Sequence, residues 1–346
     1  MITSREQIKR DIKKSILRFE RRISVANAQA GILFEEVLSE NPQLLYYISG
    51  YRASGSIAYV QISVEYSNTD VPYENIKMIA SESDLEKLLH KSVEDAEPKA
   101  VACVPTGMNV NRIYSDFNVA YGGYYSNLTN TTYETSGYEG MRFFFVTFKF
   151  KYRIGKEKLN EMERQVDSEV LYLSGRLFHP DMTKEEKAYV AHNYLAKSVE
   201  YWRKDGISDL DVSYMQSAFG ALINHRCVCQ GYAEAYKRLL DYIGIECYVI
   251  CGKIKGSNEY HAWNVVTFDG LVFYHVDVTW DSRGGGEVSW EYFCLSDRKM
   301  QPTRLWSRLG DIVCNSDKDI TSIAKKRIIE NKLKYACSGL DRKYLF

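Results

Sequence analysis

Apolar positions in the first half of the chain follow helical and strand spacing in turn. Ile8, Ile12 and Ile16 form an apolar stripe that predicts a helix. Asn27 is placed to cap a second helix, which must end before Asn41-Pro42 because a residue preceding proline disfavours helical backbone. The predicted order is a helix, a short strand, a helix and two strands, over residues 5–20, 21–25, 27–40, 44–47 and 57–66. Gly50 and Gly55 are expected in the turn between the two strands.

The same order of elements recurs further along the chain. A helix, a short strand, a second helix and a closing strand are predicted at residues 83–93, 99–103, 111–117 and 143–152. We interpret residues 1–155 as a duplicated α+β region, with repeats at about 4–78 and 82–155. The alternative is two ordinary α+β stretches that coincide. Neither repeat holds a recognisable chemical constellation, and His90 is expected on a solvated helix face, so a recognition or scaffold role is expected.

The second half, residues 156–346, places helices first and strands afterwards, which is typical of an α+β domain with antiparallel strands. Thr183 and Glu186 form a capping box at the start of one helix. The pattern predicts helices over residues 156–173, 183–201, 214–223, 229–243 and 320–335, and strands over residues 246–251, 261–268 and 271–278. The basic helix at 320–335 is expected to be a packed flank.

Cys229 stands at the start of the helix that Gly244 ends. A thiol at a helix N-terminus faces unpaired N–H groups and the positive end of the helix dipole, which favour the thiolate. His261 and Asp277 follow on the predicted hairpin. A loop over residues 268–270, with Gly270 in a left-handed conformation, would set His261 directly opposite Asp277 on one face.

These three residues form a candidate catalytic triad. Cys229 would be the nucleophile, His261 the general base and acid, and Asp277 the residue that orients the imidazole. The backbone N–H of Cys229 would supply one oxyanion donor, with Gln216 as a weak candidate for a second. Each residue alone also fits a structural role: a free cysteine can be a buried small hydrophobe, and a histidine beside Trp263 can be a satisfied core residue.

Two other assignments of the cysteines are less consistent with the sequence. Cys227 precedes the start of the helix and is therefore a poor nucleophile candidate. Cys227 and Cys229 could form half of a metal site, but no second cluster stands at ligand spacing. We expect no metal or cofactor, and no acidic loop has calcium-ligand spacing.

Four motifs together resemble the transglutaminase-like superfamily, and in particular its bacterial cysteine proteases. They are Val228-Cys229-Gln230-Gly231-Tyr232-Ala233, Gly244-Ile245, His261-Ala262-Trp263-Asn264 and His275-Val276-Asp277-Val278-Thr279-Trp280-Asp281. The resemblance covers about residues 180–300. It implies a papain-like α+β core in which Cys229, His261 and Asp277 take the triad roles, with Gln230, Trp263, Asn264 and Trp280 in support. Cys227 departs from the family pattern, which commonly has glycine there.

The composition limits the classes of partner and the locations expected for this protein. With 45 basic and 45 acidic residues the net charge is zero, which argues against nucleic-acid or membrane-surface binding driven by global charge. No apolar run reaches the length of a membrane span. The eight cysteines lack a disulfide framework spacing, so a reduced, cytoplasmic location is expected, or secretion if a signal segment preceded this sequence.

The sequence thus predicts cysteine-dependent acyl transfer on an amide of a protein or peptide, passing through a thioester. Hydrolysis is favoured, because nothing marks a dedicated amine site. The alternatives are a transglutaminase with an amine acceptor and a non-catalytic binding module with a vestigial triad. The substrate and the oligomeric state stay open.

Overall fold

The computed structural model describes residues 4–56, 58–121, 127–137, 140–203, 208–257, 259–307, 312–336 and 339–345. The chain forms two compact units, residues 1–119 with 130–151 and residues 120–129 with 152–346. Among the described helices, none is long and apolar enough to cross a membrane.

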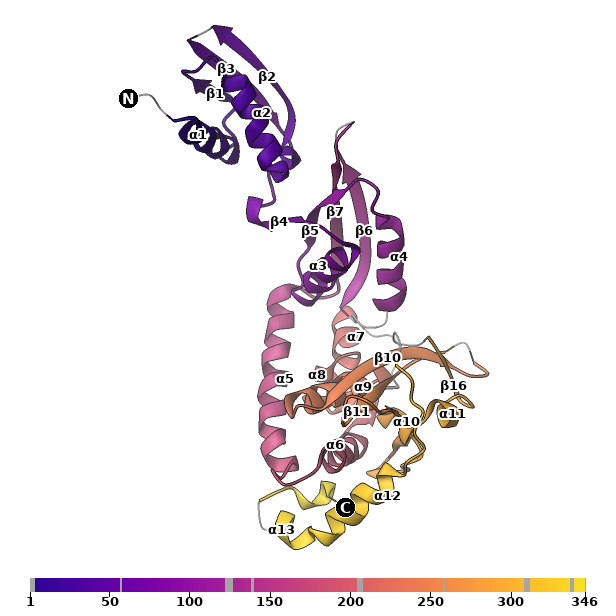
Figure 1. Ribbon diagram of the computed structural model, residues 1–346. Coiled ribbons are helices and arrows are strands. Elements are labelled where there is room, and N and C mark those ends of the chain that lie inside the picture. Colours follow the sequence, from indigo (N-terminus) through magenta and orange to yellow (C-terminus); the bar gives the residue numbers. More distant parts are fainter. Residues whose placement is uncertain are drawn as a thin grey trace. The chain divides into compact units, whose positions relative to one another are not determined.

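The first unit contains two small sheets with helices packed on them (Figure 1). Its helices are α1 (Arg5–Leu17), α2 (Ala30–Glu40), α3 (Glu82–Glu94) and α4 (Val110–Tyr121), with 3-10 turns at Pro42–Tyr46 and Tyr73–Asn75. Its strands are β1 (Arg22–Val25), β2 (Ile48–Ser56), β3 (Tyr59–Tyr66), β4 (Ile76–Met78), β5 (Lys99–Pro105), β6 (Leu128–Ser136) and β7 (Phe143–Tyr152). The strand orders are β1-β3-β2 and β4-β5-β7-β6.

Both halves of this unit show the predicted order of a helix, a short strand, a helix and a hairpin. The short strand pairs antiparallel with the second hairpin strand each time, β1 with β3 and β5 with β7. The second half adds β4, which lies parallel to β5. Duplication of one unit remains a prediction.

Three local predictions for this region were wrong. Residues 44–47 are not a strand, because Pro42 opens a 3-10 turn whose apolar side chains are buried. Gly50 and Gly55 lie within β2 rather than in a turn. His90 is half-buried, since its ring packs edge-on against Phe117 with centroids 5.7 Å apart.

The second unit surrounds a five-stranded sheet with helices. Its helices are α5 (Lys156–Leu177), α6 (Lys184–Ser198), α7 (Asp209–Met215), α8 (Ala218–Leu222), α9 (Cys229–Tyr242), α10 (Val278–Asp281), α11 (Asp297–Met300), α12 (Ile320–Glu330) and α13 (Lys332–Ala336), with a 3-10 turn at Arg342–Tyr344. Its strands are β8 (Glu200–Tyr201), β9 (Arg226–Cys227), β10 (Glu246–Ile254), β11 (Tyr260–Thr267), β12 (Phe273–Val276), β13 (Ser282–Gly284), β14 (Glu287–Val288), β15 (Phe293–Leu295) and β16 (Arg304–Trp306).

The five-stranded sheet has the order β15-β12-β11-β10-β16, and each neighbouring pair is antiparallel, as predicted. Helix α9 packs against β10 and β11, and α5, α6 and α8 pack against α9 (Figure 1). The capping box of Thr183 and Glu186 is confirmed, although α6 ends at Ser198 rather than at residue 201. The helix predicted over residues 214–223 is divided into α7 and α8, since Ser217 starts a new helix in extended backbone.

The predicted hairpin register was wrong by two residues. Thr267 pairs with Phe273, so the loop spans residues 268–272 instead of 268–270. The longer loop is held by the Asp269 carboxylate, which accepts hydrogen bonds from the backbone N–H groups of Leu271 and Val272. Gly270 does adopt the predicted left-handed conformation, with φ of 78°. A shift of two residues preserves which side chains share a face, because side chains alternate with a period of two.

Candidate active site

Cys229 is the first residue of α9 and is half-buried. Val228 precedes it in extended backbone and provides no side-chain cap. The first N–H groups of a helix have no acceptor within the helix, so those of α9 face the space beside the thiol. The helix also orients its positive dipole end toward Cys229.

Gly231 lets the first turn of α9 lie against neighbouring chain segments. A Cβ at this position would lie 2.5 Å from the Cβ of Cys227 and 2.9 Å from the carbonyl oxygens of Met215 and Ser217. The carbonyl oxygen of Met215 also accepts a hydrogen bond from the backbone N–H of Val228, at 2.9 Å. Because residue 231 has no side chain, these segments can pack closely against the first turn of α9, where Cys229 lies.

His261 and Asp277 meet in the buried interior beside Cys229. The Nε2 atom of His261 lies 2.8 Å from Oδ2 of Asp277, and both side chains are almost fully buried. Asp277 does not face His261 across the hairpin as predicted. It follows the end of β12 and caps α10, where its Oδ1 accepts a hydrogen bond from the backbone N–H of Trp280 at 3.2 Å. Because Nε2 is used by Asp277, Nδ1 of His261 is the ring nitrogen available to the Cys229 thiol.

Electrostatics favour the charged forms of all three side chains. Burial opposes ionisation of the thiol, but a hydrogen bond with His261, its charge and the backbone N–H of Ala262 outweigh burial and lower the pKa of Cys229. Burial also opposes the imidazolium, yet Asp277 and Cys229 raise the pKa of His261 to about 9. Burial would raise the pKa of Asp277, but His261 and Arg304 hold it below its ordinary value. The site thus suits a thiolate–imidazolium pair.

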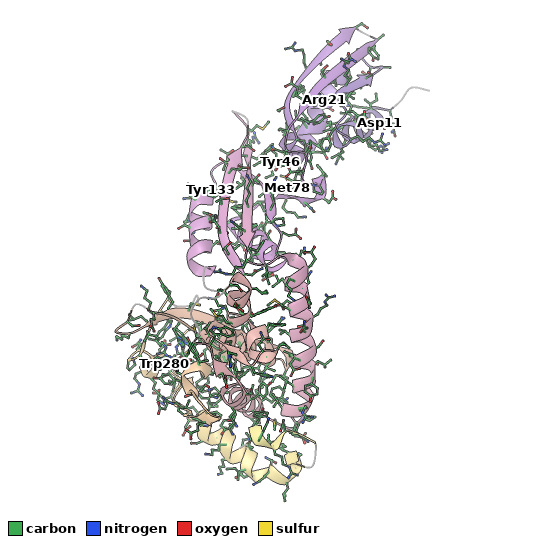
Figure 2. The ribbon with its side chains drawn as sticks, turned by 180° about the vertical axis from the view of Figure 1, so that it is seen from behind. Asp11, Arg21, Tyr46, Met78, Tyr133 and Trp280 are labelled. Atoms are coloured by element: carbon green, nitrogen blue, oxygen red, sulfur yellow. The ribbon has the colours of Figure 1, made fainter. Side chains whose placement is uncertain are left out.

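Arg304 is a site residue that the sequence analysis missed. Its Nη2 atom lies 2.6 Å from Oδ2 of Asp277, and both side chains are fully buried. The guanidinium stacks over the ring of Trp280, 3.6 Å from the ring centroid; Trp280 is labelled in Figure 2. No sequence signal joins Arg304 to Asp277, because the two are brought together only by the path of the chain through α11 to β16.

The four residues expected to support the triad differ in their contacts with it. Trp280 contributes the N–H to Asp277 and the ring under Arg304. Trp263 stacks beside His261, with centroids 6.0 Å apart, and donates its indole N–H to Nδ1 of His275 at 3.0 Å. Gln230 points along its own helix and donates to Glu234 at 2.9 Å. Asn264 lies away from the triad and donates to the carbonyl oxygen of Ala233 at 2.9 Å, which ties β11 to α9.

Gln216, the weak oxyanion candidate, ends α7 and lies in the α7–α8 connection between Met215 and Ser217. The carbonyl groups on both sides of it pack against the first turn of α9 at Gly231. Its backbone is therefore close to the N-terminus of α9.

A second histidine, aspartate and cysteine group lies behind Trp263. His275, Asp297 and Cys314 hold potential ligand atoms within 4.8 Å of one another, a spacing that a metal ion could use. However, Nδ1 of His275 accepts the indole hydrogen of Trp263, so Nε2 carries the proton that is donated to Asp297 at 2.8 Å. A metal on Nε2 would require an imidazolate, which makes a hydrogen-bonded structural group the better interpretation.

The comparisons with known proteins agree with the resemblance in the sequence. Residues 172–278 match the family model described as the transglutaminase-like superfamily. The matched residues lie within the C-terminal unit. The matched span includes Cys229, His261 and Asp277, and it ends before Trp280 and Arg304.

Two solved structures are similar to the chain. One is a putative cysteine protease from Cytophaga hutchinsonii, at 14% identity and a TM-score of 0.29, covering 46% of this chain and 68% of that one. The other is a TGase, at 12% identity and a TM-score of 0.31, covering 75% of this chain and 76% of that one. No curated protein matches the chain. The mixed helix and sheet content fits the α+β class expected of a transglutaminase-like domain.

Proposed function

We propose that the transglutaminase-like domain is a cysteine-dependent acyl-transfer enzyme acting on amide bonds of a protein or peptide. The observation that carries this proposal is the half-buried Cys229 thiol at a helix N-terminus, where His261 lowers its pKa, together with the 2.8 Å contact between His261 and Asp277. Each of the three side chains favours the protonation state that its proposed role requires.

In the proposed reaction the Cys229 thiolate attacks the carbonyl carbon of the amide, and the backbone N–H of Cys229 stabilises the developing oxyanion. Collapse of the tetrahedral intermediate breaks the C–N bond while the His261 imidazolium gives its proton to the leaving amine. This leaves a thioester on Cys229 and a neutral imidazole. An acceptor then attacks the thioester, His261 takes the proton of the acceptor, and the thiolate is restored.

The acceptor determines the class of enzyme. With water the enzyme is a peptidase or amidase, and with a primary amine it is a transglutaminase. We favour water, because no described acidic group faces the thiol in a position to select an amine. Besides His261 and Asp277, the side chains of Cys227, Cys251 and Tyr201 interact electrostatically with Cys229.

Replacing Cys229 with Ala tests the proposal. The Cys229→Ala variant should lose all turnover and all labelling by a thiol-directed acyl probe, as measured by active-site titration and mass spectrometry. Cys227→Ala is the matched control, because the Cys227 thiol is fully buried and its pKa is raised by burial; it should keep its labelling. Turnover that persists in Cys229→Ala would rule the assignment out. A peptide-library screen with and without a primary amine then distinguishes hydrolysis from transfer.

The second candidate is a non-catalytic binding module with a vestigial triad. It predicts that the wild-type Cys229 is inert to iodoacetamide at neutral pH and titrates as an ordinary thiol. The bond between His261 and Asp277, and the lowered pKa of Cys229 that His261 causes, favour the enzyme.

We also propose that residues 1–155 serve recognition or act as a scaffold for the domain at residues 156–346, and that repeats 4–78 and 82–155 arose by duplication. The shared order of elements and the matching pairs β1–β3 and β5–β7 support this. Substitutions on the surface of the first unit should alter KM for a long protein substrate and leave kcat for a short peptide unchanged.

A further inference from the structure

Arg304 is a fully buried cation whose ionic partner is the triad carboxylate. It lies on β16, at the edge of the sheet, where it pairs with Ile254 of β10. Within the described part of the chain, Asp277 is the one carboxylate at ion-pair distance from it, at 2.6 Å. A buried ion that loses its partner is costly, so the position of each charge depends on the other.

Aromatic rings hold the guanidinium in place. Its centre lies 3.6 Å from the ring centroid of Trp280 and 5.4 Å from that of Tyr292. Its Nη1 donates to the carbonyl oxygen of Thr303 at 3.2 Å, while its Nε is buried and has no hydrogen-bond partner among the described residues. A group that leaves one donor unsatisfied yet keeps its contact with Asp277 is oriented mainly by that carboxylate and by the rings.

Arg304 and His261 bind the same oxygen atom. Nη2 of Arg304 and Nε2 of His261 lie 2.6 Å and 2.8 Å from Oδ2 of Asp277. The distance between the two nitrogen atoms therefore cannot exceed the sum of these two distances. A permanent cation at that separation keeps Asp277 ionised and also repels a positively charged imidazole.

We propose that Arg304 is a positioning residue that fixes Asp277 and limits how strongly His261 holds its proton, so that the imidazolium can release it within the reaction cycle. This inference rests on the proposed cysteine-based function. Without Arg304, Asp277 would stabilise the imidazolium alone, and the thiolate–imidazolium pair would persist to higher pH.

Few charged groups besides these act at the site. Asp277 faces the His261 ring from the end of β12, and Cys229 faces it from α9. Arg304 on β16 contacts the same oxygen of Asp277 that His261 contacts. Around Cys229 itself stand the thiols of Cys227 on β9 and Cys251 on β10 and the phenol of Tyr201 on β8. Among these, Arg304 is the permanent cation.

The test is an NMR titration of the His261 ring in the full chain, with the resonance assigned by its loss in His261→Ala. In Arg304→Met we expect the midpoint of the His261 titration to rise by about one pH unit. This shift corresponds to a modest part of the Coulomb repulsion between two charges at this distance. Arg304→Lys keeps a cation on a flexible stem with a single point of contact, and its midpoint should fall between those of the wild type and Arg304→Met. Arg298→Met is the matched control: Arg298 is exposed on α11 and pairs with Asp317, so the midpoint should not change.

A midpoint that is unchanged or lower in Arg304→Met overturns the inference. If Arg304→Met has no cooperative melting transition, the comparison of wild type with Arg304→Lys decides, and an unchanged midpoint there overturns it. Carboxamidomethylation of Cys229 in the wild type separates the two proposals. An inert Cys229 contradicts the proposed function whatever the variants do, whereas a reactive Cys229 with an unmoved His261 contradicts only the role of Arg304.

Discussion

At the scale of single residues, the site depends on two opposing effects at Cys229 and His261. Burial alone would keep the thiol protonated and the imidazole neutral. His261 and the backbone N–H of Ala262 outweigh burial and lower the pKa of Cys229, although the charge of Asp277 opposes this. Asp277 and Cys229 in turn raise the pKa of His261 to about 9. The charged pair is therefore populated between the lowered pKa of the thiol and about pH 9.

This gives a prediction for the pH dependence of kcat/KM. The value should rise as Cys229 loses its proton, and it should fall near pH 9 as His261 loses the proton that the leaving amine needs. The measurement is kcat/KM on a peptide from the library screen between pH 5 and about 10. A profile that keeps rising through pH 9 would show that His261 is not the acid that protonates the amine.

At the scale of secondary structure, the N-terminus of α9 positions Cys229, the proposed nucleophile. The capping residue gives no help, because Val228 has no hydrogen-bonding side chain. Gly231 instead allows the α7–α8 connection to approach the first turn, with carbonyl groups where a Cβ would stand. The spacing of apolar positions predicts α9. The packing of α9 against residues 215–217 depends on the lack of a Cβ at Gly231.

We therefore predict that Gly231→Ala lowers the free energy of unfolding by about 2 kcal/mol, the usual cost of overpacking, and strongly reduces alkylation of Cys229. The physical reason is that the first turn must shift to relieve contacts of 2.5 Å and 2.9 Å. Gly175→Ala in α5 is the matched control, because nothing lies within 4 Å of its added Cβ, and it should be neutral or stabilising. Chemical denaturation and an alkylation assay check both variants, and equal behaviour would contradict the role of Gly231.

At the scale of the whole molecule, the C-terminal segment is part of the core of the second unit. Ile320, Ala324 and Ile328 of α12 are buried, and α12 packs against α6. Tyr335 is buried as well, and its hydroxyl donates to Oε1 of Glu186, a fully buried carboxylate, at 3.0 Å. The sequence predicted a packed flank here and did not indicate that its Tyr335 binds the glutamate of the α6 capping box.

Tyr335→Phe removes the hydroxyl that bonds Glu186 and should lower the free energy of unfolding by about 1.5 kcal/mol, as expected for a hydrogen bond to a charged group. Tyr242→Phe is the control, because Tyr242 is an exposed tyrosine at the end of α9. Urea denaturation followed by far-UV circular dichroism measures the difference. Equal free energies of unfolding for the two variants would show that the hydrogen bond from Tyr335 to Glu186 does not stabilise the fold.

The sequence by itself determined the parts of this protein that depend on local spacing. Apolar periodicity and capping residues predicted most helices and the antiparallel strands, and the thiol at a helix start, with His261 and Asp277 on a hairpin, predicted the candidate triad. The register predicted for that hairpin was wrong by two residues.

Only the tertiary structure decided what depends on distant segments meeting. Asp277 reaches His261 from the cap of α10 rather than from a strand pair. The loop before β12 is longer than predicted, and the Asp269 carboxylate holds it by accepting hydrogen bonds from the backbone N–H groups of Leu271 and Val272. Arg304 reaches Asp277 only because β16 joins the far edge of the sheet. A buried charge pair leaves no periodic signature in a sequence, since its two members need only be close in space.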